Sequence, residues 1–187
     1  TLFVEDIYLQ NLRFFNLKIQ FEDGWIKDYS CINFPDPEES KRYIYQNLLL
    51  PHQTLPLGEF AIGTNTTAYQ MARKYNIISR LPILIIEKMG PHFAIGDTCF
   101  SHEEEAPHIN FLNGKSMIAV ENEKSATRKE DPINAYINKH IDITLPYEML
   151  DSITAIGYDG TRTDIIKNGR FVLPGTEELN IPLDEGW

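Results

Sequence analysis

Alternating apolar and polar positions at the start of the chain predict short β-strands. The segments Leu2 to Leu9 and Leu17 to Phe21 are rich in β-branched and aromatic residues, which suit a half-buried pleated surface. Asp23-Gly24 is a hairpin signal, because both residue types tolerate the positive φ angles of a tight turn. It leads into a third strand over 25–31. The N-terminal portion is therefore expected to be rich in β-structure.

Two later segments carry helical patterns. Asp36 can accept hydrogen bonds from free amide groups, Pro37 suits the first helical position, and two glutamates follow at the positive end of the helix dipole. This pattern predicts a helix over 37–49. Apolar residues at helical spacing predict a second helix over 66–75. The apolar run 82–89 has no decisive periodicity, and a short helix is favoured there.

The remainder of the chain is mostly β-segments separated by turns. The predicted strands cover 93–95, 117–120, 136–145, 153–158, 164–167 and 170–173, and the turn signals are Asn113-Gly114, Asp159-Gly160 and Asn168-Gly169. An acidic loop is expected over 101–107 and a charged, solvated stretch over 121–131. The fold class is thus predicted as α+β, with a mixed and largely antiparallel sheet and two or three helices.

Length and charge narrow the function classes. The 187 residues suit one domain over 1–187. With 17 basic and 27 acidic residues the net charge is −10, so phosphate backbones and anionic bilayers would repel the chain. Nucleic acid and membrane partners are not expected. Cys31 and Cys99 form no paired motif, which favours reduced thiols and a cytoplasmic protein.

A histidine and an aspartate share one face of a predicted strand. In the segment 136–145, His140 and Asp142 are two positions apart, so a strand points both side chains the same way. Both could therefore reach one cation or two adjacent cations. The alternative is a half-buried strand whose polar face is simply solvated.

Three further residues offer the same kind of donor. His92 follows a Gly-Pro turn beside small residues, Glu59 lies among apolar residues and glycines, and Glu87 ends an apolar run. Hydrogen bonding of the histidine and salt bridges of the glutamates are the alternatives. Because all five residues are oxygen or imidazole donors suited to Zn²⁺, Co²⁺ or Mn²⁺, they indicate a metal centre.

The other reactive side chains are weaker candidates. His52, His102 and His108 are expected at the surface, and Cys99 is expected to be a buried, inert thiol. The sequence contains no nucleophile elbow, no zinc-protease helix motif, no phosphate-binding loop and no dinucleotide fingerprint.

Three blocks of the sequence resemble the thermophilic metalloaminopeptidases, the family of aminopeptidases T and S. They are Leu57 to Asn65, Glu87 to Gly96, and His140 to Asp142, and Gly169-Arg170-Phe171 is similar to the closing strand of that family. The order and approximate spacing of the blocks match, and the likeness spans most of 57–173.

The resemblance implies a site and a reaction. Glu59, His92, His140 and Asp142 would be metal ligands, with Glu87 an additional one, and they would hold two divalent ions, Zn, Co or Mn. Such a pair of ions activates water and clamps the free amino terminus of a peptide, so the N-terminal residue is released. The general base would be Glu59 or a glutamate that the family carries further upstream. A homodimer is also implied.

Two departures from the family pattern matter. A family tyrosine aligns at Cys99 or Phe100, and neither has a phenol. The upstream ligand glutamate has no counterpart before Thr1, so the chain is expected to be the C-terminal portion of a two-domain enzyme. On its own it is expected to fold but neither to hydrolyse peptides nor to hold metal tightly. The competing hypothesis is a non-catalytic β-rich assembly or dimerisation domain without metal.

Overall fold

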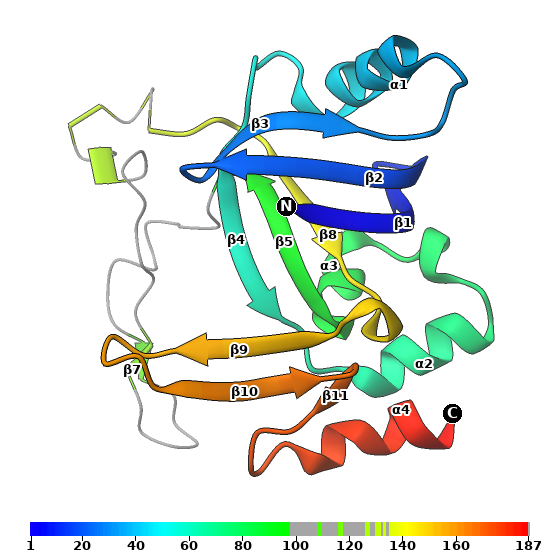
Figure 1. Ribbon diagram of the computed structural model, residues 1–187, viewed down its shortest axis with the longest axis vertical. Coiled ribbons are helices and arrows are strands. Elements are labelled where there is room, and N and C mark those ends of the chain that lie inside the picture. The colour runs from blue at the N-terminus through cyan, green and yellow to red at the C-terminus, as the bar shows by residue number, and fades with distance from the viewer. Residues whose placement is uncertain are drawn as a thin grey trace. The chain divides into compact units, whose positions relative to one another are not determined.

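Short strands and short helices alternate along the protein (Figure 1). The computed structural model describes residues 1–97, 108–109, 116–117, 126–127, 130–131, 133 and 135–186. The strands are β1 (Leu2–Leu9), β2 (Leu12–Glu22), β3 (Trp25–Ser30), β4 (Leu57–Ile62), β5 (Pro91–Gly96), β6 (His108–Ile109), β7 (Ser116–Met117), β8 (His140–Thr144), β9 (Ser152–Ile156), β10 (Arg162–Lys167) and β11 (Arg170–Phe171). The α-helices are α1 (Pro37–Ile44), α2 (Thr66–Lys74), α3 (Ile83–Ile86) and α4 (Ile181–Glu185).

This mixture confirms the expected α+β class. The sheets have the strand orders β1-β2-β3, β4-β5-β8, β6-β7 and β9-β10-β11. The pairs β2/β3, β6/β7, β9/β10 and β10/β11 are antiparallel. The described residues hold four α-helices rather than two or three: the apolar run after Pro82 forms the short helix that is favoured there, and the C-terminal segment adds one that is not predicted.

The chain forms two compact units, and it passes between them several times. Unit 1 consists of Thr1–Leu2, Lys18–Glu59 and Ala94–Ile141. Unit 2 consists of Phe3–Leu17, Phe60–Phe93 and Asp142–Trp187. The expectation of one domain over 1–187 stays a prediction.

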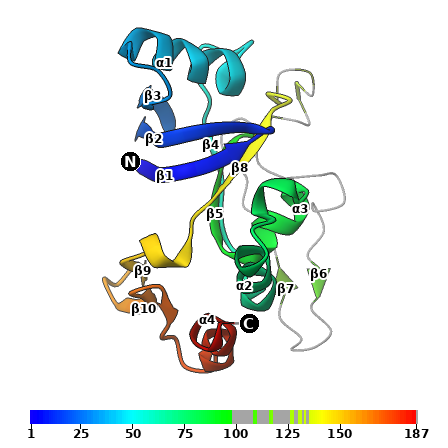
Figure 2. The same ribbon diagram turned by 90° about the vertical axis from the view of Figure 1, so that its right-hand side faces the viewer.

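Unit 1 contains the hairpin and the first helix that the sequence predicts. Asp23 and Gly24 have φ angles of 50° and 79°, which is the left-handed backbone of a tight turn. The Asp36 side chain accepts a 3.0 Å hydrogen bond from the amide of Glu38 at the start of α1. Helix α1 lies beside β3 in Figures 1 and 2 and continues as a π-helix over Tyr45–Leu49. The predicted helix over 37–49 is therefore confirmed.

Unit 2 contains the C-terminal meander β9-β10-β11. Its turns lie at the predicted Asp159-Gly160 and Asn168-Gly169, where Gly160, Asn168 and Gly169 have φ angles of 82°, 49° and 70°. Relative to the prediction, β9 and β11 end two residues earlier and β10 begins two residues earlier. Its buried core cluster consists of Tyr69, Ala72, Met89, Tyr147, Ile166, Phe171 and Leu183.

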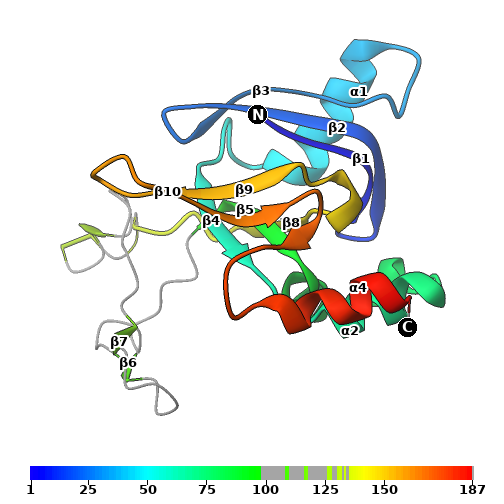
Figure 3. The ribbon, with the colours of Figure 1, turned by 60° about the horizontal axis from the view of Figure 1, so that its bottom comes forward.

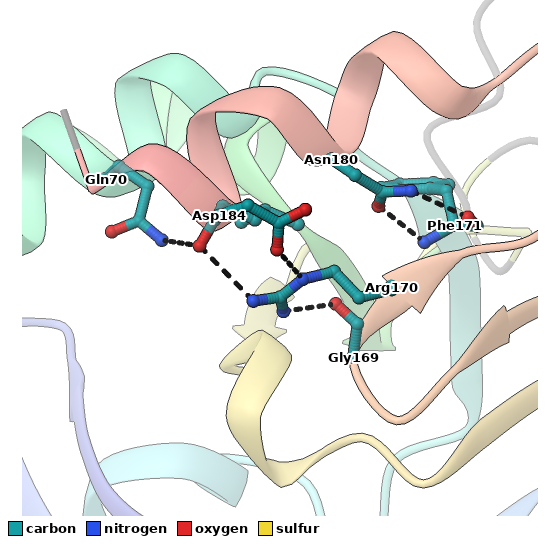
Figure 4. Close-up of polar contacts among 7 residues, drawn as sticks. Gln70, Gly169, Arg170, Phe171, Asn180 and Asp184 are labelled. Carbon is teal, nitrogen blue, oxygen red and sulfur yellow. Dashed lines mark hydrogen bonds and ion pairs between the residues drawn. The ribbon is translucent and has the colours of Figure 1, made fainter.

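A polar clamp joins β11 to the C-terminal helix (Figure 4). The Arg170 guanidinium donates from Nε to Asp184 Oδ1 at 2.6 Å and from Nη2 to the carbonyl of Leu183 at 3.2 Å. The Asn180 amide exchanges two 2.8 Å hydrogen bonds with the backbone of Phe171. These bonds satisfy backbone groups that the short strand leaves unpaired. Helix α4 lies alongside α2 (Figure 3).

The predicted strand over 136–145 is too long. Only His140–Thr144 is extended, because Asn138 has a φ of 59°. The amides of Ile137 and Asn138 donate to the Asp97 carboxylate at 2.7 and 2.6 Å, so they form a side-chain-capped turn instead of a sheet ladder. The predicted hairpin tip at Asn113-Gly114, the acidic loop and most of the charged stretch lie outside the described residues.

Candidate metal centre

Unit 2 brings Glu87, His92 and Asp142 together. Each offers one ligand atom, and these atoms lie within 4.8 Å of one another. His92 and Asp142 are only 3% and 5% exposed, and the Glu87 side chain is 12% exposed. The donors of one Zn²⁺ ion lie roughly 3 to 4 Å apart, given ligand bonds of about 2.0 to 2.2 Å. The group is therefore close to a binding arrangement, and its imidazole and carboxylates are the donors that Zn²⁺, Co²⁺ and Mn²⁺ accept.

The His92 ring is held by a backbone carbonyl. Its Nδ1 lies 3.1 Å from the carbonyl oxygen of Gly90. That oxygen can only accept, so Nδ1 carries the proton and the neutral ring keeps its lone pair on Nε2. The same carbonyl accepts a 2.9 Å hydrogen bond from the amide of Gly63. This second bond fixes the acceptor, as the outer partners of metal-ligating histidines commonly do.

Glu87 begins a 3₁₀ turn, Glu87–Met89, directly after α3. Close backbone packing holds this turn: a Cβ added to Gly63 would lie 2.3 Å from the Glu87 carbonyl oxygen, so only glycine fits there. The Asn65 amide donates to the Lys88 carbonyl at 2.9 Å. The Lys88 ammonium forms an ion pair with the Glu87 carboxylate.

Unit 1 holds an acid and histidine pair of its own. Nε2 of His140 lies 3.6 Å from Oε2 of Glu59, and their side chains are 22% and 27% exposed. Nδ1 of His140 donates to the carbonyl of Asp97 at 2.6 Å, so Nε2 is again the nitrogen with the lone pair. Glu59 lies in β4, a strand that the sequence analysis does not predict, and its burial is partial.

Strand β8 carries His140 and Asp142 in alternate positions. Successive side chains of a strand point to opposite faces, so these two share a face, as the period of two predicts. The face is not a solvated one, since Asp142 is buried and His140 is half-buried. The assignment of Glu59, Glu87, His92, His140 and Asp142 as metal ligands stays a prediction.

A cavity of about 380 Å³ lies in unit 2, and Asp142 is part of its wall. Apolar side chains of 83–89 and of Leu145 form much of the lining. Its charged residues are paired: Arg13 binds the Asp6 carboxylate with two hydrogen bonds of 2.8 and 2.5 Å. The bond from Arg13 lowers the pKa of Asp6 below its usual range.

Arg73 and Glu148 also line this cavity, and they form an ion pair of 2.8 Å. Tyr69 donates to the same carboxylate at 2.6 Å. Burial, and then the hydrogen bond to Glu148, raises the pKa of Tyr69 well above its usual range. The sequence analysis does not predict this cavity, because its lining comes from segments far apart in the chain. The one usable signal was the proximity of Asp6 and Arg13 across a short β-turn.

Where the structure describes the weaker candidates, they make ordinary hydrogen bonds to the backbone. His52 is half-buried, and its Nε2 lies 3.0 Å from the carbonyl of Ile137. Cys31 is a buried free thiol next to the carbonyl of Ser40. Cys99, Phe100 and His102 lie outside the described residues, as does the side chain of His108.

Comparisons with known proteins add no relative. No protein family, curated protein or solved structure matches the chain. None of the helices in the described ranges has the length and apolar character needed to cross a bilayer.

Proposed function

We propose that this chain carries metal-ligating residues of a dinuclear-metal aminopeptidase, in which it forms the C-terminal half, and that the enzyme removes the N-terminal residue of peptides. The observation that supports this proposal best is the group of Glu87, His92 and Asp142 within 4.8 Å of one another. Asp142 also lines a cavity of about 380 Å³, so one carboxylate belongs both to the donor group and to a space that can hold a substrate residue.

Each of the candidate ligands has a role in the proposed reaction. Glu87, His92 and Asp142 would hold one divalent ion, Zn, Co or Mn, and Glu59 with His140 offers the same donors for another. When bound, such ions supply Lewis acidity toward the peptide carbonyl and lower the pKa of water. Asp142 is buried and lines the cavity, where the peptide's amino terminus would lie. Glu59 is the candidate to accept a proton from the attacking water.

A metal titration separates this proposal from a non-catalytic assembly domain. Zinc binding by the chain is measured by calorimetry, with Asp142→Asn as the test variant and Asp159→Asn as the control. Asp159 is exposed and accepts only a local turn hydrogen bond. Zinc affinity should fall at least about tenfold in Asp142→Asn and stay unchanged in the control. The chain on its own is expected to bind zinc only weakly, so the titration extends to high zinc concentration, and the absence of even weak zinc binding in the unmodified chain would favour the assembly domain.

A peptide pair then tests the reaction class. The zinc-loaded chain is titrated with Leu-Gly-Gly and with the same peptide acetylated at its amino terminus. An aminopeptidase site should bind the free amine more tightly, because the ion and the carboxylates recognise an unblocked amino terminus. Equal affinities for the two peptides would contradict the aminopeptidase proposal while leaving a metal site intact.

Two accompanying features belong to the same proposal. A homodimer is expected in the complete enzyme, and light scattering at micromolar concentration would reveal it. We also place the protein in the cytoplasm, since its described cysteine is a free thiol.

A further inference from the structure

Asp97 follows strand β5 and makes four hydrogen bonds to the turn that enters β8. Its Oδ1 accepts from the amide of Ile137 at 2.7 Å, and its Oδ2 accepts from the amide of Asn138 at 2.6 Å. Its own amide donates to the carbonyl of Lys139 at 2.7 Å. Its carbonyl accepts from Nδ1 of His140 at 2.6 Å. Asp97 thus contacts each of the four consecutive residues 137–140, the last of which is the candidate ligand His140.

The hydrogen bonds that the carboxylate accepts stabilise an uncommon backbone conformation at Asn138. Asn138 has a φ of 59°, and a left-handed residue costs free energy unless its surroundings fix it. Hydrogen bonds to a charged acceptor are stronger than neutral ones. The carboxylate therefore fixes the turn immediately before His140.

Close packing on both sides leaves Asp97 little freedom. A Cβ on Gly58 would lie 2.4 Å from the Asp97 carbonyl oxygen, and a Cβ on Gly96 would lie 1.9 Å from the Lys139 carbonyl oxygen. Gly96 also has a φ of 110°, which suits glycine. The Asp97 carbonyl, which accepts the hydrogen bond from Nδ1 of His140, is consequently fixed in place.

We infer that Asp97 is a positioning residue, which sets the ring orientation and the tautomer of His140 so that Nε2 faces Glu59 as a metal ligand. The Asp97 carbonyl favours protonation at Nδ1. The Asp97 carboxylate holds the turn, so that Nδ1 of His140 stays within hydrogen-bond distance of that carbonyl. The role of the ligand rests on the proposed function, whereas the tautomer is a property of the metal-free chain. The two can therefore fail separately.

The first test reads the tautomer directly in the metal-free chain. A long-range ¹H–¹⁵N spectrum of the histidine rings identifies the protonated nitrogen, and His140→Ala assigns the signal. The unmodified chain should show His140 protonated at Nδ1. Asp97→Asn replaces one acceptor with a donor facing an amide, so His140 should populate both tautomers. Asp36→Asn is the matched control, since asparagine caps a helix as well as aspartate does and should leave the His140 signal unchanged.

The second test is a double-mutant cycle on zinc affinity. Asp97→Asn should weaken zinc binding roughly 10- to 100-fold, the usual loss when an outer partner of a ligand is removed. In a His140→Ala background the same substitution should have no further effect, because Asp97 acts through His140. If Asp97→Asn does not fold, Asp97→Glu, which keeps the charge but shifts it by one methylene, is carried through both measurements.

The outcomes are distinct. A folded Asp97 variant that keeps a single His140 tautomer, or one that weakens zinc binding equally without His140, overturns the positioning role. A changed tautomer in a chain that shows not even weak zinc binding supports the positioning role and overturns the proposed function instead.

Discussion

The hydroxyl of Tyr69 donates a 2.6 Å hydrogen bond to Oε2 of Glu148, which joins helix α2 to the turn that follows β8. The same hydroxyl accepts from the amide of Tyr147 at 3.2 Å. Arg73 approaches the same carboxylate oxygen to 2.8 Å. Tyr69, Arg73 and Glu148 all line the cavity that contains Asp142. One wall of the proposed substrate cavity is thus a connected polar network.

Tyr69→Phe should destabilise unit 2 without changing its packing. Phenylalanine keeps the edge-to-face contact with Tyr147, whose ring centroid lies 5.0 Å away. It removes the hydroxyl from the Tyr147 amide and from Glu148, and a buried group that loses its partner costs about 1 to 3 kcal/mol. Urea unfolding measures the difference. Tyr75→Phe, at a residue that is 63% exposed, is the control. Equal stabilities for both variants would mean that water replaces the hydroxyl fully.

Stability should fall in alkaline solution because of two buried phenols. Burial raises the pKa of Tyr69 and of Tyr147 in the folded protein, whereas unfolded tyrosine titrates near pH 10. The folded state therefore binds more protons above about pH 10, and the free energy of unfolding decreases as the pH rises. The stabilisation that the two phenols provide is complete below about pH 10, and it is lost as the pH rises toward their pKa values in the folded protein.

The slope of that decline identifies the groups. Each phenol contributes at most about 1.4 kcal/mol per pH unit. Urea unfolding between pH 9 and 11 should give a shallower decline for Tyr147→Phe than for the unmodified chain. Tyr158→Phe, at a fully exposed residue, should keep the original slope. Parallel declines in all three proteins would assign the alkaline sensitivity to other groups.

Local signals in the sequence predicted many of the elements. The hairpin at Asp23-Gly24 and the helix start at Asp36 are set by interactions within a few residues, so their physical causes are visible in the sequence itself. The strand over 136–145, which contains His140, is predicted too long for the opposite reason. Its turn depends on the Asp97 carboxylate, some 40 positions earlier.

The candidate site likewise has one part that local sequence patterns predict and another that depends on residues far apart in the chain. The shared face of His140 and Asp142 follows from strand periodicity. The approach of Glu87 to His92 depends on a carbonyl at Gly90 and on the absence of a side chain at Gly63. The Tyr69 and Glu148 network joins residues from separate elements, which no local pattern encodes.

Gly63→Ala should displace the segment that carries Glu87. The added Cβ would lie 2.3 Å from the Glu87 carbonyl oxygen and 2.4 Å from the Lys88 carbonyl carbon, and backbone atoms cannot yield as a flexible side chain can. Overpacking of this kind costs about 1 to 3 kcal/mol, and zinc affinity should fall with it. Gly157→Ala is the control, since its Cβ would crowd only the flexible Asp159 side chain and would lie 3.7 Å from the Thr161 carbonyl oxygen, an ordinary contact distance. Unchanged zinc affinity in Gly63→Ala would separate Glu87 from the metal centre.

The Lys88 ammonium competes with a cation for Glu87. The lysine side chain is 68% exposed while the Glu87 side chain is 12% exposed, and a metal ion must displace the ammonium from the carboxylate. Exposed ion pairs contribute about 0.2 to 1 kcal/mol. Lys88→Ala should therefore raise zinc affinity by up to about fivefold, with the difference shrinking at high salt because screening weakens the original pair.

Glu87→Gln is the opposing variant in the same measurement. It removes the charge that attracts the ion, so zinc affinity should fall by at least about tenfold, at low and at high salt alike. Calorimetric titration at two ionic strengths compares both variants with the unmodified chain. Weaker zinc binding in Lys88→Ala would show that the lysine supports the glutamate instead of competing for it. Unchanged binding in Glu87→Gln would reduce the donors in unit 2 to His92 and Asp142, which are too few to hold an ion tightly without further ligands.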